Sequence, residues 1–256
     1  MKALEMFSLS GKTAVLTGGR GLYGRQIAEA LYEAGAKVVM GSRDLTSLSE
    51  AAFDMRNAGG DVTALRLDLG SEASILEFAE LVGPADILVN NAVARTMSGY
   101  GNEASLFDES MRINATGLFI ITRAFGGKMI ERNGGSIINV ASIHGMIAPD
   151  PTLYEGLGLN GFIPDYFFHK GGMIEYTKFL ASYYGPYNIR CNAVSPGGLR
   201  SPKNSEEFAG RYGRRTMLGR MAGKDDLKGA IVFLASDASS YVAAANLPVD
   251  GGYIAR

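Results

Sequence analysis

Two side chains in the segment Tyr-Phe-Phe-His-Lys have the types and spacing for proton chemistry: Tyr166 and Lys170. Residues four apart on a helix share one face, so the phenol and the ammonium can converge on one point. A phenol is a poor acid near neutral pH, and a nearby cation favours its deprotonated form. The pair is therefore a candidate general acid–base, although the same spacing also arises by chance on ordinary amphipathic helices.

A glycine-rich turn near the N-terminus, Thr17-Gly-Gly-Arg-Gly-Leu-Tyr-Gly24, is a candidate dinucleotide site. It follows an apolar run and opens a helical pattern that Gly35 ends, and its glycines fit G-x-G-x-x-G. Glycine lets the backbone turn tightly and approach a pyrophosphate held at a helix N-terminus. For this motif alone, a strand-to-helix turn without a ligand remains the alternative.

Apolar runs typical of strands alternate with helical periods along the whole chain. This alternation predicts an α/β fold of the Rossmann type: a doubly wound parallel sheet of about seven strands, with helices on both faces, in a single domain over residues 1–256. Strands are expected near 12–17, 37–41, 62–67, 86–90, 135–141, 188–194 and 246–249, and helices near 22–34, 44–58, 72–82, 103–132 in two pieces, 166–185 and 225–236.

Composition narrows the class of protein. The net charge is −1, with 25 basic and 26 acidic residues, so nucleic acid and an anionic membrane are not expected as partners. The single cysteine, Cys191, excludes an intrachain disulfide. No apolar run reaches the roughly 18 residues of a membrane span, and the N-terminus lacks a signal-like apolar segment, so the expected location is the cytoplasm.

Further motifs follow the glycine turn in a fixed order. They are Asn90-Asn-Ala92, Asn114 in Arg-Ile-Asn-Ala, Ser142 in Asn-Val-Ala-Ser, the Tyr166–Lys170 pair, Asn188-Ile-Arg-Cys-Asn-Ala-Val-Ser-Pro-Gly197 and Val249-Asp-Gly-Gly252. With these motifs the chain, from about residue 8 to residue 253, resembles the short-chain dehydrogenase/reductase family of the classical single-domain type. The resemblance implies hydride transfer between a nicotinamide cofactor and a secondary alcohol or ketone.

The resemblance also implies a role for each catalytic residue. Tyr166 would be the general acid–base, and Lys170 would favour its phenolate and bind the nicotinamide ribose. Ser142 would polarise the substrate oxygen, and Asn114 would position a relay water; capping of local backbone is the alternative for the serine. The implied cofactor contacts are Gly18, Arg20, Gly21, Leu22, Tyr23, Ser42, Arg43, Asp68, Leu69, Asn91, Ala92, Tyr166, Lys170, Pro196, Gly197, Leu199 and Ser201.

The end of the second strand bears on the choice of cofactor. An acidic residue there would accept the ribose hydroxyls and repel a 2′-phosphate. The matching position is Ser42, followed by Arg43, whose guanidinium can bind a phosphate. Arg20 would add a second positive charge, whereas Asp44 is the expected cap of the next helix. NADP(H) is therefore favoured over NAD(H), with Asp68 expected to accept the adenine amino group.

Two segments are expected to form the substrate walls, because each follows a strand at the carboxyl edge of the sheet. One is the segment 197–218, and the other includes a loop at 146–165 that is longer than is usual in the family. Within the loop Glu155 and Asn160 are candidate contacts for substrate hydroxyls, with a solvated loop away from the site as the alternative. His144 is a further candidate contact, and neither histidine has partners at metal-ligand spacing, so no metal site is expected.

Three functions and one assembly follow as hypotheses. The long spacing with Tyr154-Glu-Gly is similar to that of members of sugar and surface-glycan metabolism, which favours a sugar, sugar acid or polyol as substrate. A 3-oxoacyl-[acyl-carrier-protein] reductase is the alternative, and a catalytically silent nucleotide-binding member is the second. The docking patch of the reductase would use Arg123, Lys128, Arg132, Arg211, Arg214 and Arg215. Apolar residues on more than one face of helices 103–132 and 166–185 predict a homotetramer, with a homodimer as fallback.

Overall fold

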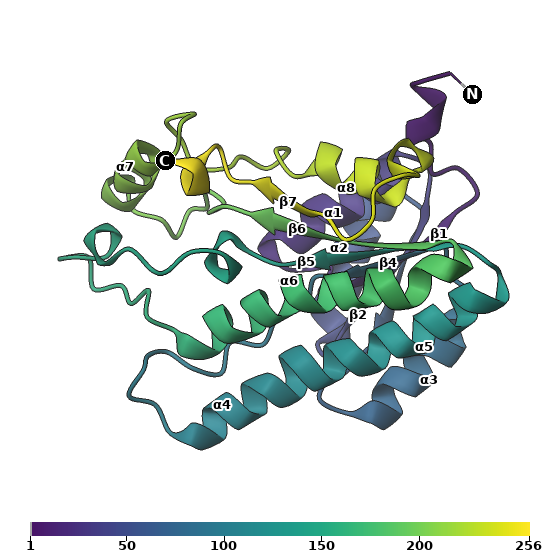
Figure 1. The fold of residues 1–256 in the computed structure, drawn as a ribbon, viewed down its shortest axis with the longest axis horizontal. Helices are drawn as coiled ribbons and strands as arrows, with labels where there is room; N and C mark the ends of the chain where they lie inside the picture. Colours follow the sequence, from purple (N-terminus) through teal and green to yellow (C-terminus); the bar gives the residue numbers. More distant parts are fainter. Residues whose placement is uncertain (1) are drawn as a thin grey trace.

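A parallel sheet lies at the centre of the structure, a computed structural model that describes residues 2–256 (Figure 1). Within these residues seven strands form the sheet, which confirms the predicted parallel sheet of about seven strands, and they pair in the order β3-β2-β1-β4-β5-β6-β7. The strands are β1 (Thr13–Thr17), β2 (Lys37–Ser42), β3 (Val62–Arg66), β4 (Ile87–Asn90), β5 (Gly135–Val140), β6 (Ile189–Pro196) and β7 (Asn246–Val249). The order reverses between β1 and β4, which creates the switch point where such sheets bind ligands.

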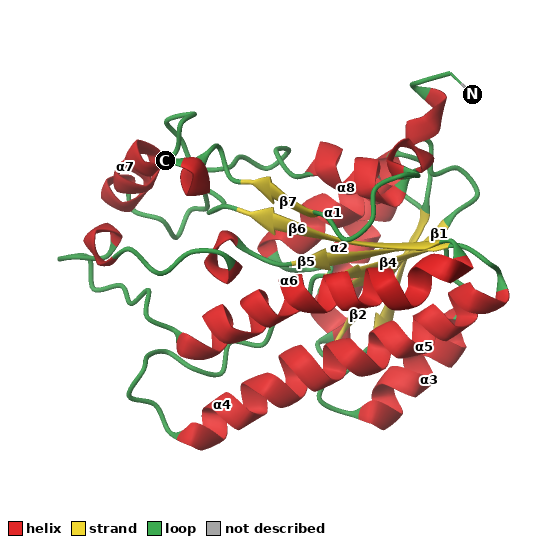
Figure 2. Ribbon diagram, in the orientation of Figure 1, coloured by secondary structure: helices red, strands yellow, loops and turns green. Residues whose placement is uncertain are grey.

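Helices cover both faces of this sheet (Figure 2). One face carries α1 (Leu22–Glu33), α2 (Leu45–Asn57) and α8 (Lys228–Ala235), and the other carries α3 (Glu72–Val82), α5 (Gly117–Glu131) and α6 (Pro164–Tyr184). The fold is completed by α4 (Ala104–Met111) and α7 (Glu206–Arg215). No helix in this part of the chain is long and apolar enough to cross a bilayer.

Burial on both faces explains why the central strands are continuous apolar runs rather than alternating ones. The side chains of Ala14, Val15 and Leu16 in β1 are all fully buried. Polar side chains fix the neighbouring elements: Asn139 accepts a hydrogen bond from Asn90 at 2.9 Å and donates one to Thr177 of α6 at 2.9 Å. This buried network ties β4 and β5 to the helix that carries Tyr166 and Lys170.

The structure differs from the sequence prediction in two segments near the site. The segment 197–218 was expected to be irregular, but it contains α7. Its start signal was readable: Ser205 caps the helix by accepting from the Phe208 N–H at 3.1 Å, and two acidic residues occupy the first turn. Between α4 and α5 the chain continues through a π-helical turn, Arg112–Thr116, which contains Asn114.

Candidate active site

A cleft of 840 Å³ runs along the carboxyl edge of the sheet and is bordered by the segments that follow β1, β2, β4, β5 and β6. It brings together residues from every sequence motif except Val249-Asp-Gly-Gly252. The predicted cofactor residues that line it are Gly18, Arg20, Gly21, Leu22, Tyr23, Ser42, Arg43, Leu69, Asn91, Ala92, Tyr166, Lys170, Pro196, Gly197 and Leu199. Ser142, His144 and Asn160 line it as well.

The glycine turn is packed against the end of β4. Gly18 has a φ of +71°, and a Cβ there would lie 2.9 Å from the backbone of Ala92. A Cβ on Gly24 would lie 2.1 Å from the Gly18 carbonyl oxygen, so both positions need glycine. The Asn91 amide donates to the carbonyls of Thr17 and Gly18, both at 3.0 Å, and holds the turn in place.

This turn fits a dinucleotide. Helix α1 begins at Leu22, and among residues 2–256 no side chain caps its N-terminus. Its first backbone N–H groups are therefore available to a pyrophosphate, which the helix dipole also favours. The hydroxyl of Tyr23 donates to the Gly197 carbonyl at 2.7 Å and joins the two walls of the cleft at this point.

At the end of β2 the charges are partly paired. Ser42 and Arg43 line the cleft, and Arg20 lies 3.6 Å from the Asp44 carboxylate. Asp44 also caps α2 by accepting from the Ser47 N–H at 3.1 Å. Hydrogen bonding to the Ser47 side chain, and secondly to this N–H, lowers the pKa of Asp44. The second positive charge that Arg20 was expected to supply is therefore shared with Asp44.

Two predicted cofactor contacts lie outside the cleft. Asp68 does not line it, and its Oδ1 accepts from the Gly70 N–H at 2.9 Å. The hydroxyl of Ser201 donates to Asn204 Oδ1 at 2.9 Å, and Asn204 rather than Ser201 lines the cleft. The expected bonds of Asp68 to adenine and of Ser201 to the nicotinamide amide are therefore not supported by this geometry.

Tyr166, Lys170 and Ser142 lie around one end of the cleft. The Lys170 side chain is buried, its Nζ donates to the Val140 carbonyl at 2.6 Å, and it lies 5.9 Å from the centre of the Tyr166 ring. Burial, and secondarily the charge of Arg95, lower the pKa of Lys170 to about 7. The Ser142 hydroxyl accepts from the His144 N–H at 3.1 Å, so its own proton remains available to a ligand.

Asn114 has a different position from these three. It is buried and does not line the cleft, although its neighbour Ile113 does. Its Oδ1 accepts from the Ala94 N–H at 2.8 Å, and its Nδ2 donates to the Ala94 carbonyl at 2.8 Å and to Ser110 Oγ at 2.9 Å. The side chain thus holds the loop after β4 and has no free N–H for a substrate.

The three candidate substrate residues have different environments. His144 lines the cleft against the Phe167 ring, with centres 4.7 Å apart, and burial followed by the charge of Arg95 lowers the pKa of His144 to about 4. Asn160 lines the cleft, but its amide already binds the Ser98 carbonyl at 2.8 Å and the Phe162 N–H at 2.9 Å. Glu155 lies outside the cleft with an exposed side chain, contrary to its expected contact with substrate.

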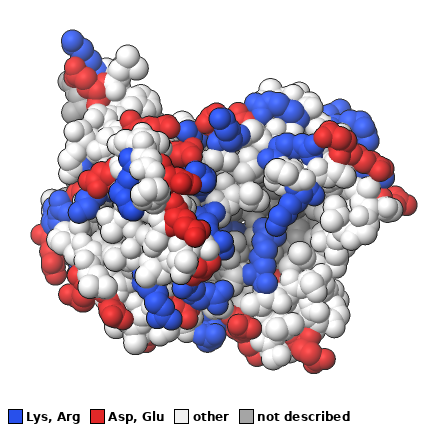
Figure 3. Space-filling model, turned by 180° about the vertical axis from the view of Figure 1, so that it is seen from behind, with Lys and Arg blue, Asp and Glu red and all other residues white. Residues whose placement is uncertain are grey.

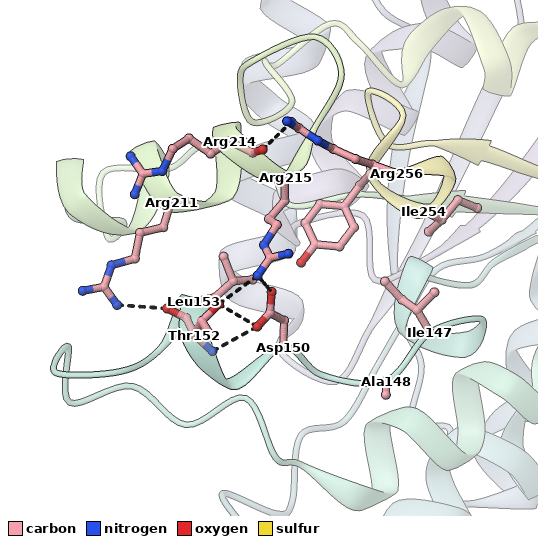
Figure 4. Close-up of a pocket in the computed structure, with 11 residues that line it drawn as sticks. Ile147, Ala148, Asp150, Thr152, Leu153, Arg211, Arg214, Arg215, Ile254 and Arg256 are labelled. Atoms are coloured by element: carbon pink, nitrogen blue, oxygen red, sulfur yellow. Dashed lines mark hydrogen bonds and ion pairs between the residues drawn. The ribbon is translucent and has the colours of Figure 1, made fainter.

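Ionic contacts tie the loop 146–165 to α7 (Figure 4). Arg215 binds the Asp150 carboxylate at 2.6 Å, and Arg211 donates to the carbonyl of Glu155 at 2.6 Å. The loop and α7 enclose a second cavity of 570 Å³ with the C-terminal segment. Because Tyr154 and Asn160 also line the main cleft, this loop forms a wall at its catalytic end.

Sequence reasoning missed two residues beside Tyr166. The guanidinium of Arg95 lies 4.9 Å from the centre of the Tyr166 ring, within reach of a cation–π contact. Its signal was its place three residues after the Asn90-Asn-Ala92 motif. Asp165 is buried to 1% exposure and accepts from Ser110 Oγ at 2.6 Å, a burial that no local pattern reveals. Within residues 2–256 no cluster of His, Cys, Asp and Glu side chains is suited to a metal ion.

Comparison with known proteins places this geometry in a family. A family model described as enoyl-(acyl carrier protein) reductase matches residues 20–254. The chain is 34% identical over 262 residues to 2-dehydro-3-deoxy-D-gluconate 5-dehydrogenase of Bacillus subtilis, covering 98% of both chains. It is 31% identical over 255 residues to galactitol 2-dehydrogenase (L-tagatose-forming) of Cereibacter sphaeroides, covering 97% of both.

A solved structure agrees in fold over the whole length. Gluconate 5-dehydrogenase from Burkholderia cenocepacia J2315, in complex with NADP and tartrate, matches with a TM-score of 0.88 at 32% identity, covering 100% of both chains. The family model and these relatives span nearly the entire sequence, including the Tyr166–Lys170 pair. The chain belongs to the short-chain dehydrogenase/reductase family.

Proposed function

We propose that this protein is an NAD(P)-dependent oxidoreductase that interconverts a secondary alcohol and a ketone on a sugar, sugar acid or polyol. The observation that carries the proposal is the single cleft that contains both the glycine turn and the side chains of Ser142, Tyr166 and Lys170. Relatives of known name support the substrate class, since they include a dehydrogenase of a sugar acid and one of a polyol.

Each catalytic residue would have a separate role in the transfer of the proton. A bound nicotinamide would supply the hydride acceptor or donor. Tyr166 would take the proton of the alcohol during oxidation and return it during reduction, while a protonated Lys170 would stabilise the phenolate. The free hydroxyl proton of Ser142 would be donated to the substrate oxygen. Asn114 would act through position, because its side chain holds the loop after β4.

NADP(H) is the proposed cofactor, in preference to NAD(H). The end of β2 has Ser42 and Arg43 facing the cleft, and the acidic residue beside them, Asp44, is engaged by the Ser47 N–H and Arg20. A 2′-phosphate would thus meet a hydroxyl and a guanidinium rather than a free carboxylate.

A homotetramer, or failing that a homodimer, is part of the proposal. On α5 and α6 the apolar residues Phe119, Phe168, Phe179 and Tyr183 are between 45% and 66% exposed. Phe179 stacks on Tyr183 with ring centres 6.1 Å apart, so these two exposed aromatics form one apolar patch on α6. A monomer mass in light scattering at micromolar concentration would refute both assemblies.

The acyl-carrier-protein alternative is supported by the matching family model, which is described as an enoyl-(acyl carrier protein) reductase. It requires a basic docking surface, and five of the six cations expected to form one are already paired with carboxylates. These pairs are Arg123–Glu72, Lys128–Glu80, Arg132–Asp86, Arg211–Glu207 and Arg215–Asp150. Figure 3 likewise shows acidic and basic side chains interspersed over the face that it draws. These cations therefore do not form a free basic patch, and their arrangement does not favour this alternative.

One experiment separates the three functions. Purified enzyme is assayed for nicotinamide absorbance change with both cofactors on sugar acids, polyols, sugars and 3-oxoacyl thioesters, with Tyr166→Phe as the control. The proposal predicts turnover on a polyhydroxylated substrate that falls by about 10²–10⁴ in the variant. A preference for thioesters would favour the reductase, and cofactor binding without any turnover would favour the silent member.

A further inference from the structure

Arg95 is the charged residue that faces the catalytic end of the cleft without a role in the proposed chemistry. It lines the cleft from the loop that follows β4, and its guanidinium lies over the Tyr166 ring at 4.9 Å from the centre. No hydrogen bond or ion pair joins its side chain to any other residue between 2 and 256. Arg95 is exposed, and its five guanidinium N–H donors are free to bind a ligand oxygen beside the reacting group.

The charges around Arg95 are of one sign. Lys170 and Arg95 are the cations at this end, and the charge of Arg95 contributes to lowering the pKa of Lys170, His144 and His169. Among the described residues that line the cleft, Asp44 is the only acidic one, and it lies at the opposite end, paired with Arg20. The positive charge beside Tyr166 therefore has no counterpart within the cleft.

Other arginines near the cleft are not equivalent to Arg95. Three of the four arginines around the cavity between the loop 146–165 and α7 have side chains engaged with protein groups (Figure 4). Arg215 binds Asp150, Arg211 binds Glu207, and Arg256 donates to the carbonyl of Arg214 at the end of α7. These contacts account for the three as loop anchors and a helix cap, and Arg214, the fourth, lies outside the cleft, unlike Arg95.

We propose that Arg95 binds a carboxylate of the substrate, so that the enzyme selects a sugar acid over a neutral sugar or polyol. The inference rests on the proposed oxidoreductase function and narrows its substrate class. A carboxylate would lie beside the Tyr166 ring and accept two parallel N–H bonds from the guanidinium, while the hydroxyl-bearing carbon lies between Ser142 and Tyr166. It would also supply the missing negative charge next to Lys170 and favour the ammonium form of that residue.

The test compares binding rather than turnover alone. Calorimetry on the enzyme–NADP⁺ complex measures the affinity for D-gluconate and 2-dehydro-3-deoxy-D-gluconate, for the neutral polyols sorbitol and galactitol, and for D-glucose 6-phosphate as a phosphate-bearing sugar. The variants are Arg95→Met, Arg95→Lys and the control Arg214→Met, in which an exposed arginine outside the cleft loses the same charge. Hydride transfer on the same compounds is assayed in parallel.

We expect at least one carboxylate to bind the wild-type complex about tenfold or more tightly than the polyols. Arg95→Met should weaken the binding of that carboxylate by about tenfold to hundredfold and leave the affinities for the polyols and for NADP⁺ unchanged. Arg95→Lys should recover part of the loss, because an ammonium keeps the charge but not the paired N–H geometry. Arg214→Met should behave as wild type.

Failure of the inference is distinguishable from failure of the proposed function. Equal carboxylate affinity in wild type and Arg95→Met, a wild-type preference for the polyols, or tighter binding of D-glucose 6-phosphate than of either carboxylate would each overturn the role of Arg95. If the polyols are then oxidised normally, the oxidoreductase function stands. Absence of hydride transfer on every compound would refute the function, while the binding data would still decide the role of Arg95.

Discussion

The hydroxyl of Ser110 donates a 2.6 Å hydrogen bond to the carboxylate of Asp165, and both side chains are buried. The same hydroxyl accepts from Asn114 Nδ2 at 2.9 Å. Asn114 in turn binds both backbone groups of Ala94. A continuous chain of hydrogen bonds therefore runs from the loop after β4, through α4, to the residue directly before Tyr166 on α6.

Ser110→Ala should lower both stability and activity. It leaves the Asp165 carboxylate and one Asn114 N–H buried without a partner, which costs about 1–3 kcal/mol for each group, and more for the charged one. The turnover number should also fall, because small displacements of Tyr166 or of the loop after β4 misplace the reacting groups. Urea unfolding and steady-state kinetics measure the two effects. Asp165→Asn is the milder comparison, since an amide oxygen can still accept the hydrogen bond from Ser110. A Ser110→Ala enzyme as stable and active as wild type would show that this chain of hydrogen bonds contributes to neither property.

Arg43→Ala should weaken NADPH binding selectively. A guanidinium at the end of β2 can bind the 2′-phosphate with charge-assisted hydrogen bonds, which NADH lacks, so NADPH should lose roughly tenfold in affinity and NADH little. Fluorescence titration with both cofactors measures the change. Arg20→Ala is the matched comparison, and its effect should be smaller because Arg20 lies 3.6 Å from Asp44. An equal loss for the two cofactors on Arg43→Ala would rule out the NADP(H) assignment.

The histidines should make the protein lose stability on mild acidification. Burial is the main cause that lowers the pKa of His144 to about 4 and that of His169 to about 3, from an ordinary value of 6.5. Between pH 6.5 and about 4 the unfolded chain binds protons that the folded chain does not, so stability falls as pH falls through this window. Each histidine contributes a slope of about 1.4 kcal/mol per pH unit at most.

Urea unfolding at pH 7, 6 and 5 in the protein without ligands measures this slope. A His144→Gln, His169→Gln double variant should show a flatter dependence, whatever its stability at pH 7. These are the only two histidines in the sequence, and carboxylates of ordinary pKa titrate mainly below this range. An unchanged slope in the double variant would show that other groups are responsible.

Local signals explain what the sequence predicted well. The parallel sheet and the positions of its strands follow from apolar runs that alternate with helical periods, and the capping role of Asp44 follows from its place before a helix. The glycine turn was identifiable because its backbone excludes side chains: a Cβ on Gly24 would lie 2.1 Å from the Gly18 carbonyl oxygen. Each of these features depends on a few consecutive residues.

Features that depend on packing between distant segments were not predicted. Nothing in the sequence indicates that Asp165 is buried against Ser110, or that Glu155 faces away from the cleft while Tyr154 beside it lines the cleft. Arg95 was passed over for the same reason, since its position above the Tyr166 ring arises only when the loop after β4 meets α6. Helix α7 was not predicted, although its capping serine and the charged residues of its first and last turns are signals within the segment itself. Its apolar face packs on the loop 146–165 rather than on the sheet.

The contact between that loop and α7 leads to the last prediction. Arg215→Met removes the bond to Asp150, a partly exposed ion pair whose loss should cost less than about 1 kcal/mol of stability. The same change frees the loop that places Tyr154 and Asn160 along the cleft. We therefore expect a higher KM for the polyhydroxylated substrate. The affinity for the cofactor should be unchanged, because the glycine turn and the end of β2, which would bind the cofactor, are not part of this loop.

Asp150→Ala should reproduce this effect, since it removes the other partner together with the hydrogen bonds that Asp150 accepts from Thr152 at 3.0 and 2.7 Å. Light scattering accompanies the kinetics, because a loop that serves mainly as a contact between subunits would change the particle mass instead. A raised KM at constant mass supports the loop as a substrate wall. A normal KM in both variants would contradict that role and leave the ionic contacts of Figure 4 as loop anchors alone.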